Sequence, residues 1–290
     1  MSTKAEQDAA IAKQTTGHEW DGIREYDTPL PKWWVYVFYV TIVVAIAMFV
    51  LYPSVPGISG YYEGVLGRQE RSVLDETLAR AAERQAGNLS AIAASTPTEI
   101  NADPQLREFA MVGGRTAFAD NCAPCHGLGG GGQQGGYPVL VDDDWLWGGT
   151  MADIEHTIRV GIRGTDAQTR TSVMPAFGQL GMLDGAQIGD VADYVLSLSG
   201  QAHDTAAAER GAGIFAEQCA ACHGADGAGM QSVGAPSLRD QIWLYGSDRA
   251  SIMAQIDNPR LGVMPTWQGR LDDATIKMLT VYVHNSGGGQ

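Results

Sequence analysis

Two short segments of this chain repeat one arrangement of cysteine and histidine. The pattern Cys-x-x-Cys-His occurs at residues 122–126 and again at residues 219–223. On one helical turn the two sulfur atoms of such a pattern project from the same face, where both can form thioethers with the vinyl groups of a haem. The histidine that follows is then placed to bind the iron as its proximal ligand. The pattern therefore predicts two covalently bound haems c. Their attachment residues and proximal ligands are Cys122, Cys125, His126, Cys219, Cys222 and His223.

Two other uses of paired cysteines compete with haem attachment. A zinc site takes four ligands and so needs a second pair close by, but 93 residues lie between Cys125 and Cys219. A redox-active disulfide uses the Cys-x-x-Cys spacing but gives the following histidine no role. No cysteine of the sequence is left over for a third purpose. Two copies of the full pattern favour haem attachment over both alternatives.

The sixth iron ligand must come from the opposite face of the porphyrin, and Met174 and Met264 are the candidates. They follow the two motif histidines by 48 and 41 residues, and each precedes a proline. That proline biases the methionine backbone towards an extended form, from which the thioether can point across the haem. Methionine that only fills a core is the alternative. His156, His203 and His284 do not recur between the copies, so we expect them to be surface or core residues.

Histidine and methionine on opposite faces of a haem iron specify redox chemistry. A neutral thioether stabilises ferrous iron and raises the reduction potential. With both faces occupied, no position is open for oxygen or peroxide. The ligand set therefore predicts an electron-transfer protein, and no catalytic residue is assigned.

Two prolines and two tryptophans are candidates for supporting these ligands. Pro138 and Pro236 lie 12 and 13 residues after the motif histidines. This region resembles that of soluble monohaem cytochromes c, which implies that each proline carbonyl accepts a hydrogen bond from the proximal histidine. A turn proline is the alternative. Trp145 and Trp243 are placed either to donate to a haem propionate or to fill the core.

The haem motifs lie within a longer internal repeat, which predicts the elements that hold them. FADNCAPCHGLGGGG aligns with FAEQCAACHGADGAG, and a Trp, a Met-Pro pair, a Leu-Asp pair and a Tyr follow in the same order in both copies. The offset between copies falls from 97 residues at the cysteines to 90 at the methionines and 88 at the tyrosines. We therefore expect two tandem class I cytochrome c domains, at residues 111–200 and 201–290.

The last segment of each repeat is predicted to be helical. Apolar residues follow Asp184 and Asp272 at spacings of three and four, which gives one apolar face, and each aspartate is placed to cap the helix start. The repeats contain no convincing run of alternating strand residues. The predicted fold class is mainly α.

Residues 33–52 form a twenty-residue run without a charge. A helix of that length spans roughly 30 Å, the thickness of a bilayer core. A buried core helix or a cleaved signal sequence is the alternative, but the run is long for either and has no small-residue cleavage site nearby. The sequence therefore predicts one N-terminal transmembrane helix. It lies between a polar cytoplasmic segment at 1–32 and a partly helical periplasmic connector at 53–110.

The charge distribution bears on partners and on orientation. The net charge is −14, so nucleic acid, which binds clustered Lys and Arg, is not expected as a partner. The acidic run Asp142–Asp144 indicates either steering of a basic electron donor or a solvated loop. Lys13, Arg24 and Lys32 precede the span, whereas the nearest basic residue after it is Arg68, which favours a cytoplasmic N-terminus. Because bacteria attach haem c in the periplasm, we expect a single-pass protein of the inner membrane with both haem domains in the periplasm.

Two tandem haem domains behind one N-terminal span resemble the dihaem subunit, CcoP or FixP, of the cbb3-type cytochrome c oxidases. Beside the haem motifs, the similarity includes Gly17–Ile23, Glu25 and Pro29–Trp34, which lead into the span. That run is more specific than the haem motifs, which many cytochromes share. The chain departs from some members of the family in having one clear span and not two.

The resemblance implies a place in a larger complex, a proton-pumping cytochrome c oxidase. A cytochrome c donor would supply electrons, which would pass through the two haems to a monohaem cytochrome subunit and then to a haem–copper catalytic subunit. Nothing in the sequence supplies copper ligands or a proton channel. Two other functions stay open on the residues alone. One is the dihaem cytochrome subunit of a periplasmic dehydrogenase complex, and the other is a dihaem peroxidase, which would leave one haem without its methionine.

Overall fold

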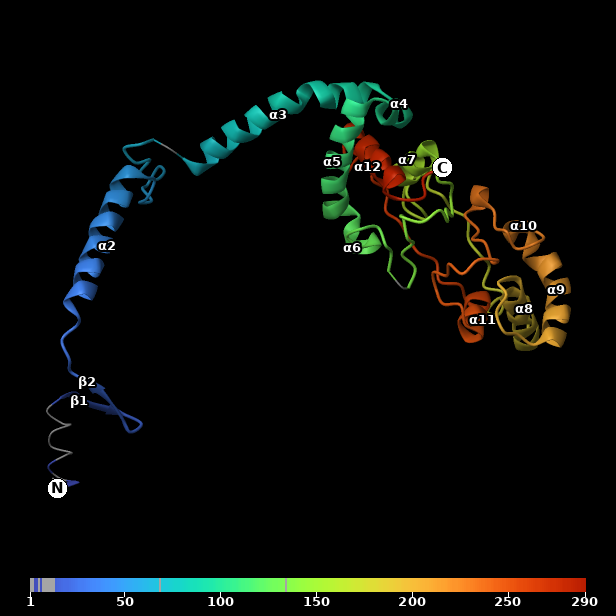
Figure 1. The fold of residues 1–290 in the computed structure, drawn as a ribbon, viewed down its shortest axis with the longest axis horizontal. Coiled ribbons are helices and arrows are strands. Elements are labelled where there is room, and N and C mark those ends of the chain that lie inside the picture. The colour runs from blue at the N-terminus through green and yellow to red at the C-terminus, as the bar shows by residue number, and fades with distance from the viewer. Residues whose placement is uncertain (1–2, 5, 7–13, 68, 134) are drawn as a thin grey trace. The chain divides into compact units, whose positions relative to one another are not determined.

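The computed structural model describes residues 3–4, 6, 14–67, 69–133 and 135–290 (Figure 1). Part of the predicted cytoplasmic segment 1–32 therefore lies outside the described residues. The chain divides into two compact units, residues 1–83 and residues 84–290. Helices predominate among the described elements, which confirms the mainly α fold class.

The first unit contains a β-hairpin that the sequence analysis did not predict. Strands β1 (Thr15–Trp20) and β2 (Ile23–Tyr26) pair antiparallel. Asp21 and Gly22 form the turn between them, with φ values of 49° and 84°, as a two-residue hairpin turn requires. The Asp-Gly pair between the two strands is the signal that would have predicted this hairpin.

Helix α2 (Lys32–Leu51) occupies the uncharged run, within one residue of the predicted bounds at each end. An 18-residue stretch of it has a mean hydropathy of 2.5, and no residue of the helix is buried within the described part of the chain. Pro31 precedes the helix and Pro53 follows its C-cap Tyr52, so prolines stand at both boundaries. A helix this long and apolar, without a protein surface to cover it, is suited to a lipid bilayer.

Helix α3 (Glu70–Ala94) runs from the first unit into the second. Ile92 near its end is fully buried with Ile100 of α4 (Pro97–Ala102). Both pack against Val281 of the C-terminal helix α12 (Asp273–Ser286). The last part of the predicted connector 53–110 therefore belongs to the core of the second unit.

Eight further elements complete the second unit. They are α5 (Pro104–Asn121), α6 (Ala123–His126), α7 (Met151–Val160), α8 (Gly185–Leu198), α9 (Thr205–Gln218), α10 (Ala220–His223), the short 3-10 turn η1 (Gln231–Val233) and α11 (Arg249–Asp257). Asp184 and Asp272 accept backbone hydrogen bonds at the starts of α8 and α12, which confirms both predicted caps. Helix α5 begins at Pro104, inside the predicted connector, so the helix that leads to the first haem motif starts before residue 111.

The helices of the two repeats pair across the repeat boundary. Helix α5 of the first repeat packs against α12 of the second, and α8 of the first repeat packs against α9 of the second. Helix α7 likewise contacts α12, and α11 contacts α8. We name α5, α6, α7 and α12 the first module, and α8, α9, α10 and α11 the second module; the two groups are separate in Figure 1.

Equivalent residues set the helix crossing in each module. Gly114 of α5 lies against the backbone of α12, and Gly211 of α9 lies against the backbone of α8, where neither position has room for a Cβ atom. A pair of tilted aromatic rings lies one turn further along each crossing. The pairs are Phe118 with Tyr282, 5.4 Å between ring centroids, and Phe215 with Tyr194, 5.1 Å apart. Each pair joins one residue of the first repeat to one of the second. The pairing of helices across the repeat boundary therefore gives both modules the same contacts.

Two crossover segments carry the chain between the modules. Residues 161–173 lead from α7 towards α8, and residues 258–263 return from α11 towards α12. The backbones of Ile162 and Met264 exchange two hydrogen bonds of 3.0 Å. Arg163 donates from Nε to the carbonyl oxygen of Gly262 at 2.7 Å. Backbone hydrogen bonds and the side chain of Arg163 therefore hold the two crossovers to each other.

The sequence analysis expects two tandem domains at 111–200 and 201–290, and the helix contacts of the structure run between these two ranges. The connection between α8 and α9, residues 199–204, is short, and short connections make consecutive helices antiparallel neighbours. Because the contact residues are equivalent in the two repeats, replacing a helix by its counterpart from the other repeat costs each core little free energy. Each module is built from both repeats.

Candidate haem-binding sites

Each Cys-x-x-Cys-His segment forms a single helical turn directly after a longer helix. In the first module α6 follows α5, and the amide of His126 donates to the carbonyl of Cys122 at 2.9 Å. In the second module α10 follows α9, and His223 makes the same bond to Cys219 at 3.0 Å. None of the four cysteines forms a disulfide bond. Each turn thus presents two sulfurs and one imidazole together, as haem attachment requires.

The first cysteine of each motif is partly buried, whereas the second is exposed. Burial raises the pKa of the Cys122 and Cys219 thiols to about 11, and the neighbouring cysteine of each pair adds to the shift. Both thiols are therefore neutral at physiological pH.

The two motif histidines are held in the same way. Nδ1 of His126 lies 3.0 Å from the carbonyl oxygen of Pro138, and Nδ1 of His223 lies 3.0 Å from that of Pro236. A carbonyl oxygen only accepts, so Nδ1 carries the proton and Nε2 keeps its lone pair. Burial lowers the pKa of both imidazoles, against an opposing effect of the bond to proline. A neutral imidazole with a free Nε2 is the form that binds haem iron.

The structure brings each candidate methionine to the motif of the other repeat. Met264 packs against the apolar cluster of the first module, which includes Phe118 and Cys122. Met174 packs against the cluster of the second module, which includes Phe215 and Cys219. The sequence order suggests that each methionine serves the histidine that precedes it. The packing instead joins each methionine to the motif of the other repeat.

The two tryptophans differ in their partners. Nε1 of Trp145 donates to the carbonyl oxygen of Gly288. Nε1 of Trp243 is buried and has no hydrogen-bond partner among the described residues. Each ring packs on the apolar cluster of its module, beside Met264 and Met174 respectively. A buried donor without an acceptor is costly, so the Trp243 indole fits a site that receives an anionic group such as a haem propionate.

The structure adds polar groups that the sequence reasoning missed. Nε of Arg170 is buried without a hydrogen-bond partner in the described part of the chain. Its guanidinium stacks over the ring of Trp147, 5.0 Å from the centroid. Arg170 lies four residues before Met174, and Arg260 lies four residues before Met264. This shared spacing in the repeat is the signal that would have found both arginines.

The remaining histidines take no part in either cluster. His156 is exposed on α7. Nδ1 of His203 lies 2.7 Å from the carbonyl oxygen of Gln201, and Nε2 of His284 lies 3.1 Å from that of Gln290. Their contacts are local and do not recur in the other repeat.

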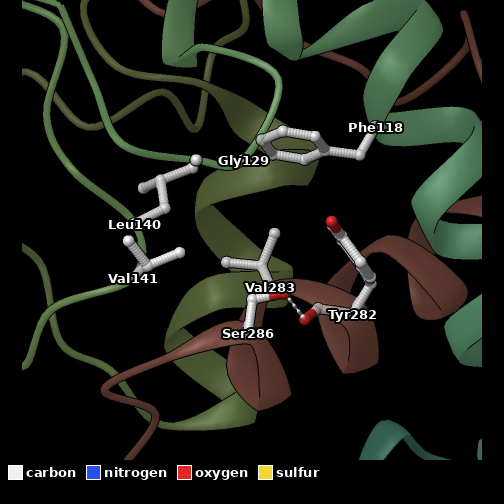
Figure 2. A pocket seen from close by; sticks show the side chains of 8 residues that line it. Phe118, Gly129, Leu140, Val141, Tyr282, Val283 and Ser286 are labelled. Carbon is white, nitrogen blue, oxygen red and sulfur yellow. Dashed lines mark hydrogen bonds between the residues drawn. The ribbon is translucent and has the colours of Figure 1, made fainter.

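A small apolar pocket lies beside the crossing of α5 and α12 (Figure 2). Figure 2 shows Phe118 and Tyr282 on one side and Leu140 and Val141 on the other. The hydroxyl of Ser286 donates to the backbone carbonyl of Tyr282 at 2.7 Å. The pocket has no ionisable lining residue apart from the Tyr282 phenol, so it belongs to the packing of the first module and not to a further reactive site.

Comparison with known proteins gives matches along nearly the whole chain. A family model described as the N-terminal domain of cytochrome oxidase-cbb3, FixP, matches residues 12–59. A second, described as cytochrome c oxidase, cbb3-type, subunit III, matches residues 110–195 and 206–283. The cbb3-type cytochrome c oxidase subunit CcoP of Azospirillum sp. (strain B510) is 52% identical over 96% of both chains. The subunit FixP of Bradyrhizobium diazoefficiens is 48% identical over 100% of both chains, and the subunit CcoP of Cereibacter sphaeroides is 47% identical over 100% of both.

Proposed function

The chain belongs to the CcoP/FixP family of cbb3-type cytochrome c oxidase subunits, and from this premise we propose that it carries two haems c, one on each Cys-x-x-Cys-His turn. It is an electron-transfer subunit of an oxidoreductase complex, with cytochrome c domains and one N-terminal helix suited to anchor it in a membrane. Each haem would supply an iron that changes between the ferric and ferrous states. The residues of the chain set the ligands, the burial and the hydrogen bonds of that iron.

Our proposed ligands form two crossed pairs. His126 and Met264 would bind the iron in the first module, and His223 and Met174 would bind it in the second. The observation that carries this proposal is the packing of each methionine on the cluster that holds the other repeat's cysteine. The prolines at 138 and 236 would fix the proximal imidazoles through the 3.0 Å contacts at Nδ1.

The proposed direction of electron flow is from a cytochrome c donor to a monohaem cytochrome subunit and then to a haem–copper subunit that reduces oxygen. Support comes from the printed names of the relatives, which are subunits of cbb3-type cytochrome c oxidases. The acidic residues Asp142–Asp144 suit a basic donor. We also propose that residues 1–32 face the cytoplasm and that both modules lie in the periplasm, because basic residues precede α2.

Subunit composition tests this function against a dehydrogenase subunit. The tagged full chain should co-purify with a haem–copper subunit, and the complex should oxidise reduced cytochrome c with oxygen. A quinoprotein or flavoprotein partner without a haem–copper subunit would instead assign the chain to a dehydrogenase. A haem stain together with haem quantification should give two covalent haems per chain.

Single-haem variants test the crossed ligand pairs. With Cys219→Ser and Cys222→Ser, only the His126 haem should be attached. In that background Met264→Ala should give a five-coordinate, carbon monoxide-binding haem, whereas Met174→Ala should leave the haem six-coordinate. The opposite result would assign each methionine to the histidine that precedes it in sequence.

A further inference from the structure

Each haem site is contacted by one aromatic side chain that belongs to the other module. Trp147 precedes α7 in the first module, and Tyr245 precedes α11 in the second. They are equivalent in the repeat, since each lies two residues after a site tryptophan. Both are partly buried, and neither ring lies in the apolar cluster of its own module. Their contacts point towards the opposite site.

Trp147 contacts the loop that holds the proline acceptor of His223 and the arginine that precedes Met174. Its indole fills the space where a Cβ atom of Gly234 would lie, and Gly234 stands two residues before Pro236, the acceptor of the His223 imidazole. The guanidinium of Arg170 stacks on the same indole, 5.0 Å from the ring centroid. Arg170 stands four residues before Met174. One ring thus touches the proximal loop and the distal segment of a site that is not in its own module.

Tyr245 makes the reciprocal contacts to the first module. A Cβ atom at Gly136 would lie 2.7 Å from the tyrosine ring, and Gly136 stands two residues before Pro138. Arg260, four residues before Met264, stacks on the ring at 4.9 Å and donates to the backbone oxygen of Tyr245 at 3.1 Å. The amide of the preceding residue 135 also donates to the carbonyl of residue 244 at 3.3 Å.

Two glycines make these close approaches possible. Gly136 has φ of +117° and Gly234 has φ of +61°, conformations that side chains with a Cβ rarely adopt. The aromatic ring occupies the space that the missing side chain leaves. Each ring also stacks with an arginine guanidinium. Such a cation–π contact contributes about 0.5–1 kcal/mol at an exposed site and more where the pair is desolvated. The proximal loop, the ring and the distal segment therefore form one packed unit.

We propose that Trp147 and Tyr245 are positioning residues, each of which holds the proximal loop and the methionine segment of the haem in the opposite module. The proposal rests on the crossed His/Met ligation of the proposed function. A ligand keeps its position at the iron only when the residues that support it are themselves fixed. Loss of the ring frees the methionine segment, and loss of the neutral thioether removes its preference for ferrous iron. Each haem therefore depends on the integrity of the other module.

The test uses the full-length, haem-loaded chain in detergent. The absorption band that a thioether gives with ferric haem iron reports methionine ligation, and a background variant makes it report one site. Met264→His leaves the band of the Met174 site alone, and Met174→His leaves that of the Met264 site. In the first background Trp147→Ala should lose the band and Tyr245→Ala should keep it. In the second background the two outcomes should exchange, and each lost band should accompany a lower potential of that haem in a redox titration.

Phenylalanine variants separate positioning from folding. Trp147→Phe and Tyr245→Phe keep an aromatic ring in place, so both should retain the band in every background. Loss of the band at the site in the residue's own module, loss at both sites or loss at neither would overturn the proposal. A parent chain without any thioether band would instead refute the His/Met ligation of the proposed function. The failure of that ligation and the failure of the positioning role therefore give different spectra.

Discussion

The two modules share their interior contacts but differ in the residues that cover the outer face of one helix. That helix is the C-terminal helix of each repeat, α12 in the first module and α8 in the second. In the first module Val281 of α12 is fully buried against Ile92 and Ile100 of the helices that lead in from the connector. The equivalent residue of α8 is Asp193, which is only 3% exposed. Its carboxylate pairs with Arg249 of α11 at 2.9 Å. One helix face is thus covered by apolar side chains and the other by an ion pair.

This difference shows which part of a duplicated domain is free to change. The helix crossing and the motif turn are equivalent in both modules, because the same cofactor chemistry and the same close glycine contact constrain them. The outer face is constrained only by its neighbour. Where α3 and α4 cover it, an apolar residue stabilises the contact. Where α11 and the start of α9 are near, the half-exposed Arg249 and the amide of Asp204 satisfy the carboxylate.

The largest predicted effect comes from exchanging these two residues between the modules. Val281→Asp places a carboxylate at a fully buried position beside Ile92 and Ile100, which should lower the free energy of unfolding by about 3–5 kcal/mol. Asp193→Val should lower it by only about 1–2 kcal/mol, because the side chain of Arg249 is 49% exposed and can turn to water, whereas the amide of Asp204 loses one acceptor. Urea denaturation of the haem-loaded chain measures both. Equal losses of unfolding free energy in the two variants would show that α3 and α4 do not cover the first module.

The aromatic pairs give the next effect and test the crossing itself. A double-mutant cycle between Phe118→Ala and Tyr282→Ala should show a coupling free energy of about 0.5–1.5 kcal/mol, because the rings are in contact. The matched cycle with Tyr194→Ala should show coupling near zero, since Tyr194 packs on Phe215 instead. The reverse ranking would mean that each repeat folds by itself.

The haem motifs, the span and the helix caps could be predicted because each is a local pattern. Asp184 and Asp272 accept hydrogen bonds from amides two or three residues ahead, and a sequence shows such spacings directly. The partner of α5 could not be predicted in the same way. The aromatic residues at 194 and 282 are identical in type and follow the same pattern, so the sequence offers α5 two equivalent partners. The connection at 199–204 and the crossovers decide between them, and their geometry is not visible in residue types.

The same reasoning explains which site residues were missed. Trp147 and Gly234 are far apart in sequence and touch only because the modules are crossed. Their equivalents are Tyr245 and Gly136, so the repeat shows that these positions correspond but not that one contacts the other. Arg170 was overlooked because its contact is to the Trp147 ring and not to a motif residue. Contacts between repeats are the part of the site that repeat alignment does not reveal.

A third prediction uses Asp144, whose equivalent in the second repeat is Ile242. Burial, and then repulsion from Asp240 and from the neighbouring aspartates, raises the pKa of Asp144 from 3.8 to about 6. The folded chain thus binds the proton more tightly than the unfolded chain, so stability falls as pH rises from about 4 to about 6 and stays lower above it. Asp144→Asn should therefore stabilise the chain by about 1 kcal/mol at pH 7, after allowance for solvent screening of a half-exposed group. It should have no such effect below pH 4. Thermal or urea unfolding across this range measures the difference, and a gain that does not vary with pH would contradict the stated cause.

The smallest predicted effect separates the two tryptophans. Trp145 donates to the carbonyl of Gly288, whereas the Trp243 indole has no acceptor among the described residues and is free for a propionate. Trp243→Phe should therefore leave that propionate less compensated, favour ferric iron and lower the potential of the His223 haem. A hydrogen bond worth about 0.5–1.5 kcal/mol corresponds to roughly 20–60 mV for one electron. Trp145→Phe should lower the potential of the His126 haem by less, since its indole already has a protein acceptor. Spectroelectrochemical titration of both variants measures the contrast, and equal shifts would mean that both indoles contact a propionate and that the bond to Gly288 gives way when haem is attached.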